Sequence, residues 1–582
     1  MLVDRNRSGK LGSSSLSPMT QAREINSALR KAIGVCLMAL GMGLASWLYW
    51  PCMDSQVTGF LSDDGVYAIT AKALATGKGY TLLHLPGLPA QVKYPILYPL
   101  LLSAGWLLNP DFPANLPLLH WITAIFAIAA IPLLMGYLRR VHVSSAGMAG
   151  FIALLVISNF HFMFYATSLM SEAPYFFCSL LALWIAESRL NHPATTSNAK
   201  SKSLEPKALG LMVVCSALAF HTRTIGLTLI AAIGLCLLLQ KRWKDATIYL
   251  VGALLITVVP WGLWVMSHAP AVNAVNYPLA FVYGGYGVEY GIHAPHDWPG
   301  YWQAILEKGV QPLMDTLLYL LLPMLPYWLA KTPLLLALAA LFVSALLLVQ
   351  GIHAIKRKRF SPSGLYVGLY LATLALWLYP NQAPRFMAML LPWLWVYFFN
   401  ACRDLTSSLP IRFPARSRFP ANLLSVLLIG TLTLWPAWQG YGLLKRIRTR
   451  HWLEPSGQHA WLWEEYKAAF AFIQKHTAPS ARIAGMWEPV IYLYTGRTGF
   501  VLFTAALQPV HGQIRHESFA RLMNSLQAYQ VDYVMSEPFL LNQEFKSPLN
   551  PVVEGLKTMA PQRFGQIYDS PRHAIKIYRF SR

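Results

Sequence analysis

The amino-acid sequence predicts an all-α polytopic membrane bundle followed by a small α/β domain. Three observations lead to this prediction. Of the 582 residues, 55% are hydrophobic and only 12% are charged, which is too apolar a composition for an ordinary soluble protein. Several apolar runs reach the roughly 20 residues that a helix needs to cross a bilayer. From about Tyr441 the acidic residues return and the apolar runs shorten, which indicates a separate soluble domain.

We expect about eleven transmembrane helices within residues 30–440, after a basic cytoplasmic tail at residues 1–29. The predicted spans are residues 30–50, 114–138, 145–165, 169–187, 208–222, 224–240, 246–266, 333–355, 364–380, 386–400 and 421–440. This arrangement places most basic loops on one side, as the positive-inside rule requires. It also requires the apolar segments 96–108 and 316–330 to lie at the outer interface without crossing.

The same topology defines the parts that lie outside the bilayer. Two large outer loops are expected, at residues 51–113 and 267–332. Residues 441–582 alternate amphipathic helical patterns, at 460–476 and 517–530, with strand-like runs. The strand-like runs are residues 481–487, 531–537 and 574–580. We therefore expect an extracytoplasmic α/β domain at the C-terminus, preceded by a basic run at residues 445–450.

The net charge of +22 comes from 47 Lys and Arg against 25 Asp and Glu. In a soluble protein such an excess would indicate nucleic-acid binding. Here the basic residues lie largely between the hydrophobic segments, so we attribute the charge to membrane topology and expect no nucleic-acid partner. The six cysteines form neither a disulfide framework nor a metal-binding pattern.

A few ionisable residues stand at the expected outer ends of the spans. They are Asp63, Asp64, Lys93, Glu172, Arg223 and Arg385. Each charge at such a depth costs about 2 to 3 kcal/mol unless it meets water or a partner, so the set indicates a wet functional cavity. A carboxylate can accept a proton from a hydroxyl, and Lys and Arg can bind a phosphate. The set therefore fits group transfer from a phosphate-linked donor.

Six short motifs in chain order carry a family resemblance. They are DD-x-x-Y from Asp63 to Tyr67, KYPILYP at 93–99, MSEAPYF at 170–176, TRTIGL at 222–227, PRFMAMLLP at 384–392 and WEPVIYLYTGR at 487–497. Together they resemble the GT-C superfamily of membrane glycosyltransferases. The similarity is greatest to the bacterial branch related to protein O-mannosyltransferases and lipid A aminoarabinose transferase. It extends over nearly the whole chain and implies a GT-C bundle in a bacterial inner membrane, with the N-terminus cytoplasmic.

The resemblance implies an inverting glycosyltransferase that moves a sugar from a polyprenyl-phosphate carrier to an acceptor hydroxyl at the outer face. It implies Asp63 as the catalytic base and Lys93 as a contact of the carrier phosphate, with Arg223 and Arg385 as looser matches. Asp64, Glu172 and Tyr67 would orient the acceptor or the donor. Relatives of the aminoarabinose type often carry arginine where this chain has Val66. The acceptor class stays open among lipid, polysaccharide and protein. The scheme itself needs no metal, although some GT-C relatives use a divalent ion.

Other interpretations remain at this point. Ser62, Asp63 and Asp64 are also the residues that begin an ordinary helix, and Lys93 could extend to the interface as lysines near span ends do. A transporter or flippase of lipid-linked glycans would also need a charged cavity, and a non-catalytic assembly subunit could carry the outer domain. The absence of an internal repeat and the location of the charges on one face argue against transport.

Overall fold

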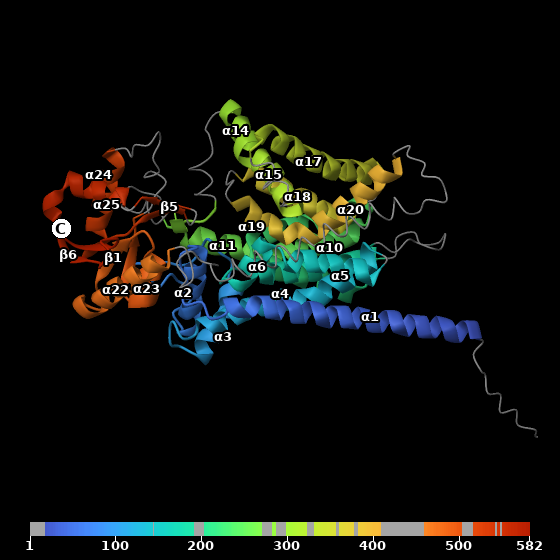
Figure 1. Cartoon of the computed structure of the whole chain (residues 1–582), viewed down its shortest axis with the longest axis horizontal. Coiled ribbons are helices and arrows are strands. Elements are labelled where there is room, and N and C mark those ends of the chain that lie inside the picture. The colour runs from blue at the N-terminus through green and yellow to red at the C-terminus, as the bar shows by residue number, and fades with distance from the viewer. Residues whose placement is uncertain are drawn as a thin grey trace, which may run out of the picture.

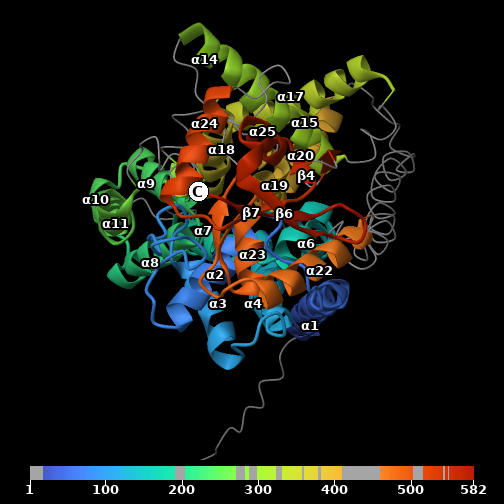
Figure 2. The ribbon, with the colours of Figure 1, turned by 90° about the vertical axis from the view of Figure 1, so that its left-hand side faces the viewer.

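A computed structural model describes residues 18–143, 145–190, 203–270, 282–286, 298–322, 331–356, 360–377, 382–408, 459–502, 516–541, 544–547 and 550–582. The helices run side by side in an elongated bundle, and an α/β domain lies at one end of it (Figure 1). Seen from that end, the α/β domain lies in front of the bundle (Figure 2). The chain is mostly helical and has a small sheet near its C-terminus, which agrees with the predicted fold class.

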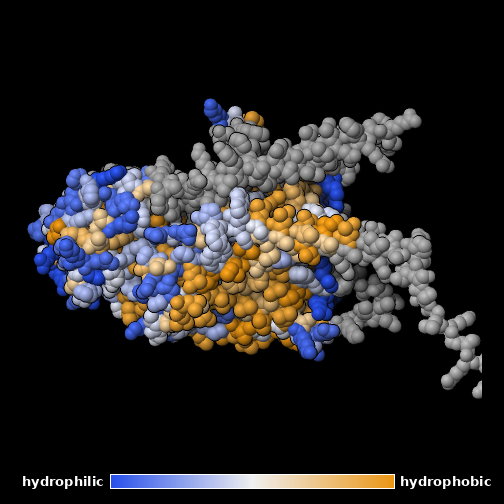
Figure 3. Space-filling view, turned by 60° about the horizontal axis from the view of Figure 1, so that its bottom comes forward, coloured by the Kyte–Doolittle hydropathy of each residue, from blue (hydrophilic) through white to orange (hydrophobic). Residues whose placement is uncertain are grey.

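The first half of the bundle is built from helices that follow one another closely in the chain. They are α1 (Pro18–Tyr49), α4 (Leu116–Val141), α5 (Ala146–Ile157), α6 (Phe160–Thr167), α7 (Glu172–Leu190), α8 (Pro206–Thr222), α9 (Leu227–Leu239), α10 (Trp243–Ile256) and α11 (Val258–His268). The second half contains α14 (Trp298–Ala304), α15 (Gln311–Leu321), α17 (Pro333–Lys356), α18 (Pro362–Leu376), α19 (Ala383–Met387) and α20 (Leu391–Ser408). Figure 3 shows a broad hydrophobic band across this bundle, bounded by the hydrophilic C-terminal end.

Fewer helices than predicted have the length of a full span. Among the described residues, four helical segments are long and apolar enough to cross a membrane, or five if one bent pair counts as a span. The four are Ala32–Cys52, Leu116–Val141, Trp243–His268 and Pro333–Ile352. The count of about eleven is therefore not confirmed. Several predicted spans are instead shorter apolar helices, and the predicted span 421–440 and the basic run 445–450 lie outside the described residues.

The bent pair corrects the prediction of one continuous helix at residues 145–165. Helices α5 and α6 meet at an angle of 66°. The break falls at Asn159, whose side-chain oxygen accepts hydrogen bonds from the backbone nitrogens of His161 and Phe162. Asparagine in this position begins a new helix, because it satisfies backbone donors that the preceding turn leaves unpaired.

Residues 51–113, the segment predicted to be the first outer loop and called by that name below, contain two helices, α2 (Asp63–Ala75) and α3 (Leu97–Leu108), which pack against each other. Helix α2 ends before Gly77, which has a φ of +69° that favours glycine. Helix α3 covers the apolar segment 96–108. Nearly all of α2 is buried, although it lies outside the spans, because α3 and the C-terminal domain cover it.

The C-terminal domain is a five-stranded sheet with helices packed on it. The strand order is β2 (Thr498–Val501), β1 (Arg482–Gly485), β3 (Tyr533–Ser536), β7 (Lys576–Phe580) and β6 (Phe564–Asp569). The first three strands are parallel, and β7 and β6 are antiparallel to their neighbours. The helices are α22 (Ala460–His476), α23 (Glu488–Thr495), α24 (His516–Ala528) and α25 (Pro551–Met559), and β4 (Phe539–Leu541) and β5 (Glu544–Ser547) form a separate hairpin. Helix α22 coincides with the predicted helix at 460–476.

The C-terminal domain rests directly on the first outer loop. Helix α23 packs against α2, and a Cβ added at Gly65 would lie 2.9 Å from the Cβ of Pro489. The backbone nitrogen of Gly499 donates a hydrogen bond to the carbonyl of His84 over 2.6 Å. The hydroxyl of Tyr494 also meets the backbone of this loop, at Gln56. The domain therefore helps to fix the position of α2.

Candidate active site

Two carboxylates, the partly exposed Asp63 and the buried Glu172, stand at the beginning of helices. Asp63 is the first residue of α2 and Glu172 is the first residue of α7. The N-terminus of a helix carries a partial positive charge, so both positions favour an ionised carboxylate. Arg223 directly follows the last residue of α8 and caps the C-terminus of that helix, where the partial negative charge favours a cation. Local helix geometry therefore already suits the sign of each charge.

Tertiary folding joins these charges into one chain of ion pairs. The guanidinium of Arg385, in α19, lies 2.8 Å from Asp63 Oδ2 through Nη1 and contacts Glu172 Oε1 through Nε. Arg223 Nη1 lies 2.6 Å from the same Glu172 oxygen. The side chain of Glu172 is 1% exposed and that of Arg385 is 7% exposed. We call Asp63, Arg385, Glu172 and Arg223 the charge cluster; its two acids and two bases cancel in formal charge.

The second carboxylate oxygen of Glu172 differs from the first. Oε1 accepts from both arginines, whereas Oε2 is buried and has no hydrogen-bond partner among the described residues. Leaving a buried charged oxygen unsatisfied is costly, so such atoms usually have a functional explanation. Glu172 therefore keeps one acceptor position available inside the cluster.

Aromatic and hydroxyl groups hold the two arginines in place. The ring of Phe386 lies 5.0 Å from the Arg223 guanidinium and 5.5 Å from that of Arg385, which also faces Tyr165 at 5.5 Å. Such contacts attract a cation and restrict its side chain. The hydroxyl of Ser171 accepts a hydrogen bond from Arg223 Nη1 over 3.0 Å. Ser171 and Phe386 lie inside motifs seen in the sequence, but nothing in the sequence singled them out.

Asp63 is the member of the cluster that is most accessible, with a side chain that is 20% exposed. Its Oδ1 accepts a hydrogen bond from the hydroxyl of Tyr94. Burial raises the pKa of Asp63, but the Arg385 guanidinium, the Tyr94 hydrogen bond and the Lys93 ammonium outweigh it and bring the pKa below the ordinary value. The preceding residue, Ser62, has a φ of +69°, a strained conformation of a kind that often accompanies functional sites.

Asp64 lies next to Asp63 in the chain but has different contacts. Its carboxylate accepts hydrogen bonds from the backbone nitrogens of Gly59, at 2.7 Å, and Leu61, at 3.1 Å, and from the hydroxyl of Thr58. Burial raises the pKa of Asp64. These bonds tie the loop before α2 to the start of the helix. Ser62, the expected helix cap, makes no side-chain capping bond.

The other predicted residues surround the cluster. Lys93 Nζ donates to the carbonyl of Val282 over 3.2 Å and lies above the rings of Tyr94 and Tyr286, at 5.9 and 5.8 Å. The hydroxyl of Tyr67 lies 3.0 Å from that of Ser171, which itself bonds Arg223. All seven predicted site residues thus lie in or beside one region, with Asp64 directed toward its own loop.

A cavity of about 390 Å³ opens beside the cluster. Arg223, Tyr67 and Tyr94 line its polar end, and α9 and α18 supply apolar side chains such as Leu227 and Leu369. The remaining lining residues include Ile225, Ala231, Tyr286, Leu374, Trp377 and Phe386. A hydrophobic chain with a phosphate at one end matches this change from apolar to cationic lining.

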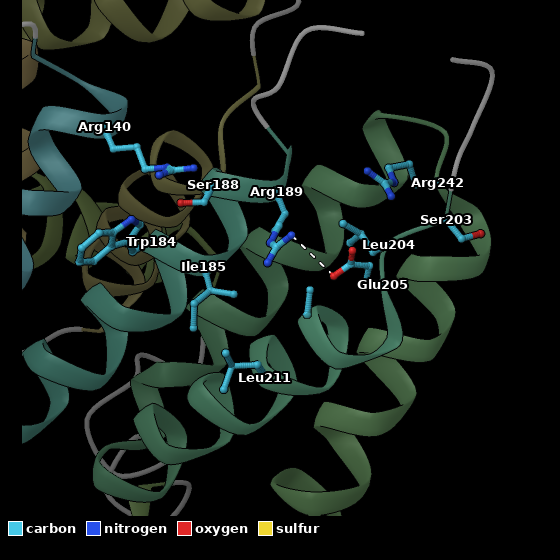
Figure 4. Close-up of a pocket in the computed structure, with 11 residues that line it drawn as sticks. Arg140, Trp184, Ile185, Ser188, Arg189, Ser203, Leu204, Glu205, Leu211 and Arg242 are labelled. Atoms are coloured by element: carbon cyan, nitrogen blue, oxygen red, sulfur yellow. Dashed lines mark ion pairs between the residues drawn. The ribbon is translucent and has the colours of Figure 1, made fainter. Parts of the chain in front are cut away.

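A second cavity, of about 680 Å³, lies at the other end of α7. Figure 4 shows Arg140, Arg189 and Arg242 around it. Arg189 pairs with Glu205 at 3.8 Å, and Arg242 pairs with Asp245 at 2.8 Å. Because the chain's own carboxylates compensate two of its three arginines, this cavity is the weaker candidate for binding an anion.

Metal binding has no support from clustered ligands in the part of the chain that the structure describes. Within those ranges no three His, Cys, Asp or Glu side chains are grouped so that they could hold an ion. Asp63 and Glu172 come together, but each is ion-paired to arginine. The two acids of the cluster therefore do not form a preformed metal site.

Comparison with known proteins finds similarity in structure but not in sequence. No protein family and no curated protein matches the chain. The oligosaccharyltransferase AglB of Archaeoglobus fulgidus, tethered to an acceptor peptide, aligns over 96% of this chain and 75% of its own, with a TM-score of 0.54 and 13% identity. AglB with an inhibitory peptide and dolichol-phosphate aligns over 95% and 75%, with a TM-score of 0.50 and 13% identity. This chain has the GT-C fold.

One further solved structure aligns with most of this chain. ArnT from Cupriavidus metallidurans, bound to undecaprenyl phosphate, aligns over 93% of this chain and 97% of its own, at 14% identity and a TM-score of 0.49. AglB has also been solved with zinc and sulfate. At these levels of identity the similarity establishes the fold, and the chemistry has to be argued from the site.

Proposed function

We propose that this chain is an inverting glycosyltransferase that takes a sugar from a polyprenyl-phosphate carrier and transfers it to an acceptor hydroxyl. The main support is the charge cluster, in which ion pairs connect the partly exposed carboxylate of Asp63 to two arginines, one of which, Arg223, lines a largely apolar cavity. The GT-C fold adds support, because AglB with that fold has been solved with dolichol-phosphate. A soluble sugar nucleotide would not need the apolar part of the cavity.

The reaction begins with the acceptor hydroxyl beside Asp63. The Asp63 carboxylate takes the hydroxyl proton while the acceptor oxygen bonds to the anomeric carbon of the sugar. The bond between that carbon and the phosphate oxygen breaks, and the electron pair leaves with the carrier phosphate. Attack opposite the leaving group inverts the anomeric centre, through a transition state with oxocarbenium character. The lowered pKa of Asp63 keeps it ionised and able to accept a proton at neutral pH.

The cations stabilise the phosphate as its negative charge increases. We assign this role to Arg223, Arg385 and Lys93, because preformed donors directed at a developing charge lower the barrier. Two of them already sit in the cluster, and Lys93 acts on Asp63 electrostatically from close by. Arginine binds phosphate oxygens through two parallel donors, which also orients the donor.

Three further residues act by positioning. Glu172 holds both arginines and offers its free oxygen, Oε2, to a substrate hydroxyl. Tyr67 lines the cavity and reaches the cluster through Ser171. Asp64 contributes through the loop that it ties to α2. We therefore expect Asp64 to orient Asp63, and only indirectly the substrates.

The cellular setting belongs to the same proposal. The apolar helices make the chain an integral membrane protein. We place it in a bacterial inner membrane, with the N-terminus cytoplasmic and residues 441–582 on the outer side, where the cluster faces lipid-linked donors. The acceptor is a lipid, a polysaccharide or a protein; AglB has been solved tethered to an acceptor peptide.

The test is transfer of labelled sugar from a polyprenyl-phosphate donor by the purified full chain. Asp63→Asn removes the proton acceptor with little change in size and should lower turnover at least 100-fold, within the range for loss of a general base. Asp54→Asn, at an exposed acid of the same outer loop, is the matched control and should keep full turnover. Full turnover in Asp63→Asn, or movement of the intact donor across the bilayer without transfer, would contradict the proposal.

A further inference from the structure

The hydroxyl of Tyr283 lies between two separate parts of the molecule. It donates a hydrogen bond to Glu488 Oε1 at the start of α23, and it lies 2.9 Å from His84 Nε2 in the first outer loop. Because the hydroxyl proton points to Glu488, the imidazole must donate in turn to the tyrosine oxygen. Burial lowers the pKa of His84 to about 3, so the ring is neutral and one nitrogen carries the proton.

All three groups are inaccessible to water. Tyr283 is 4% exposed, Glu488 is 2% exposed and His84 is 0% exposed. Removing the tyrosine hydroxyl would leave a buried carboxyl oxygen without this partner, which is unfavourable because water cannot replace the lost hydrogen bond. The contact is therefore a specific attachment. We call Tyr283, Glu488 and His84 the tyrosine anchor.

The residues beside Tyr283 reach the candidate active site. The carbonyl of Val282 accepts the hydrogen bond of Lys93 Nζ, at 3.2 Å. The ring of Tyr286 packs against Trp377 at 5.4 Å and Tyr94 at 6.4 Å, and it lines the apolar cavity. Val282 is next to Tyr283 in the chain and Tyr286 is three residues after it. Because each residue extends the chain by no more than about 3.6 Å, fixing Tyr283 also restricts the positions of Val282 and Tyr286.

We propose that Glu488 is a positioning residue of the active site, which through Tyr283 holds Lys93 and Tyr286 in place for the carrier phosphate. The C-terminal domain then contributes to donor binding without touching the donor. This inference rests on the proposed function, because it takes Lys93 to contact the phosphate. It goes beyond that function by assigning a task to a residue of the C-terminal domain, on the far side of α2 from the bundle.

The experiment measures binding of undecaprenyl phosphate to the full chain in lipid nanodiscs. Tyr283→Phe keeps the ring but loses the hydroxyl, and should weaken binding at least fivefold. Glu488→Ala should do the same, whereas Glu488→Gln, which keeps an acceptor oxygen, should restore most of the affinity. In sugar transfer these variants should raise KM for the donor and also lower kcat, because Lys93, which the anchor holds, both binds the phosphate and stabilises the charge that develops on it.

A matched bond in the same domain supplies the control. The hydroxyl of Tyr466 donates to Glu537 Oε2 over 2.9 Å, and both residues are buried. Tyr466→Phe therefore removes an equivalent bond that leads to neither Lys93 nor the cavity. It should change affinity less than twofold. Equal losses in Tyr466→Phe and Tyr283→Phe would show a general destabilisation of the domain and would overturn the proposal.

A double-mutant comparison tests whether the anchor acts through Lys93. Lys93→Gln alone should weaken binding, and adding Tyr283→Phe to it should then have less than half of its usual effect on the free energy. If the effects of the two substitutions on the binding free energy are fully additive, the tyrosine anchor does not act through Lys93.

Hydrogen–deuterium exchange without ligand gives a separate readout. Tyr283→Phe should speed exchange of peptides that contain residues 282–286, and unchanged exchange would show that the anchor does not hold them. If the wild-type protein and the Lys93→Gln variant bind undecaprenyl phosphate with equally low affinity, the proposed function is contradicted. If Tyr283→Phe still speeds exchange in that case, the tyrosine anchor does hold residues 282–286. It would then not serve binding of the carrier phosphate, and the proposal would be overturned.

Discussion

At the scale of single residues, Glu172 decides the shape of the charge cluster. One of its oxygens contacts Arg223 and Arg385, and Arg385 in turn contacts Asp63. Removing the anionic partner of a buried arginine lowers the stability of the fold by several kcal/mol, because the arginine is left charged in a place where water does not solvate it. The side chain of Glu172 therefore compensates two cations at once.

We predict that Glu172→Gln lowers the free energy of unfolding by about 3 kcal/mol, as expected when one partner of a buried ion pair is removed. It should also lower sugar transfer at least tenfold, since both arginines lose the negative charge of Glu172 and Arg385 is left with Asp63 to hold it. Thermal unfolding and turnover of the purified chain measure the two effects.

Glu187→Gln is the control, because Glu187 is equally buried in the same helix and is held by Tyr137 and the backbone of Ser363. It should cost stability but not turnover. Similar turnover losses in both variants would mean that stability alone explains the effect.

The residue types of the cluster could be predicted from sequence, but their contacts could not. Asp63, Glu172, Arg223 and Arg385 stood out because charges are rare near the ends of apolar runs. Their pairing joins positions up to 322 residues apart, the separation of 63 and 385, and no local pattern encodes that distance. The different contacts of Asp63 and Asp64 were also hidden, because they depend on the strained backbone at Ser62.

At the scale of elements, short and strongly patterned segments were the most predictable. The amphipathic helix at 460–476 appears as α22, and the predicted strand-like runs contain β1, β3 and β7. The apolar runs were harder, because hydrophobicity alone does not show where a helix breaks. Asn159 divides one predicted span, and shorter apolar helices such as α9 are packed inside the bundle.

Within the sheet domain, we predict a pH-dependent stability that arises from Glu537. Its carboxylate accepts from the backbone nitrogens of Met486 and Trp487 and from Tyr466, and burial raises its pKa to about 7. Between pH 4.5 and 7 the unfolded chain releases this proton while the folded chain retains it. The contribution is therefore complete below pH 4.5 and is lost as the pH rises through 7.

Glu537→Gln should flatten this profile. We expect the difference in Tm of the full chain between pH 5 and pH 7.5 to shrink by at least about 4 °C, the change that ~1 kcal/mol makes in a domain of this size. Glu488, whose pKa burial raises to about 8, retains a slope of the same sign. A profile identical to that of the wild type would rule out Glu537 as its source.

At the scale of the whole molecule, the close approach of α2 and α23 joins the bundle to the C-terminal domain. A Cβ at Gly65 would lie 2.9 Å from both the Cβ of Pro489 and the Cα of Gly59. The first of these two atoms belongs to a proline ring and the second to the backbone, so neither can rotate away. The position of Asp63, two residues earlier, depends on this packing.

We predict that Gly65→Ala destabilises the chain by about 1 to 3 kcal/mol, the usual cost of overpacking. It should also reduce transfer, because displacing α2 moves Asp63 away from Arg385. Differential scanning fluorimetry and turnover are the measurements.

Gly210→Ala, on the exposed face of α8 where a Cβ would meet nothing within 4 Å, should be neutral or slightly stabilising. If Gly65→Ala behaves like Gly210→Ala, the two domains tolerate movement at this contact.

The shared oxygen of Glu172 has a consequence for the catalytic cycle. In the proposed reaction, when a spent carrier leaves, the arginines that held its phosphate still have a resident counter-ion, so they need not recruit an anion from the surroundings before the next round. Departure of the product then returns the cluster to a neutral resting arrangement, and the same glutamate that organises the empty site competes with the phosphate for its two cations.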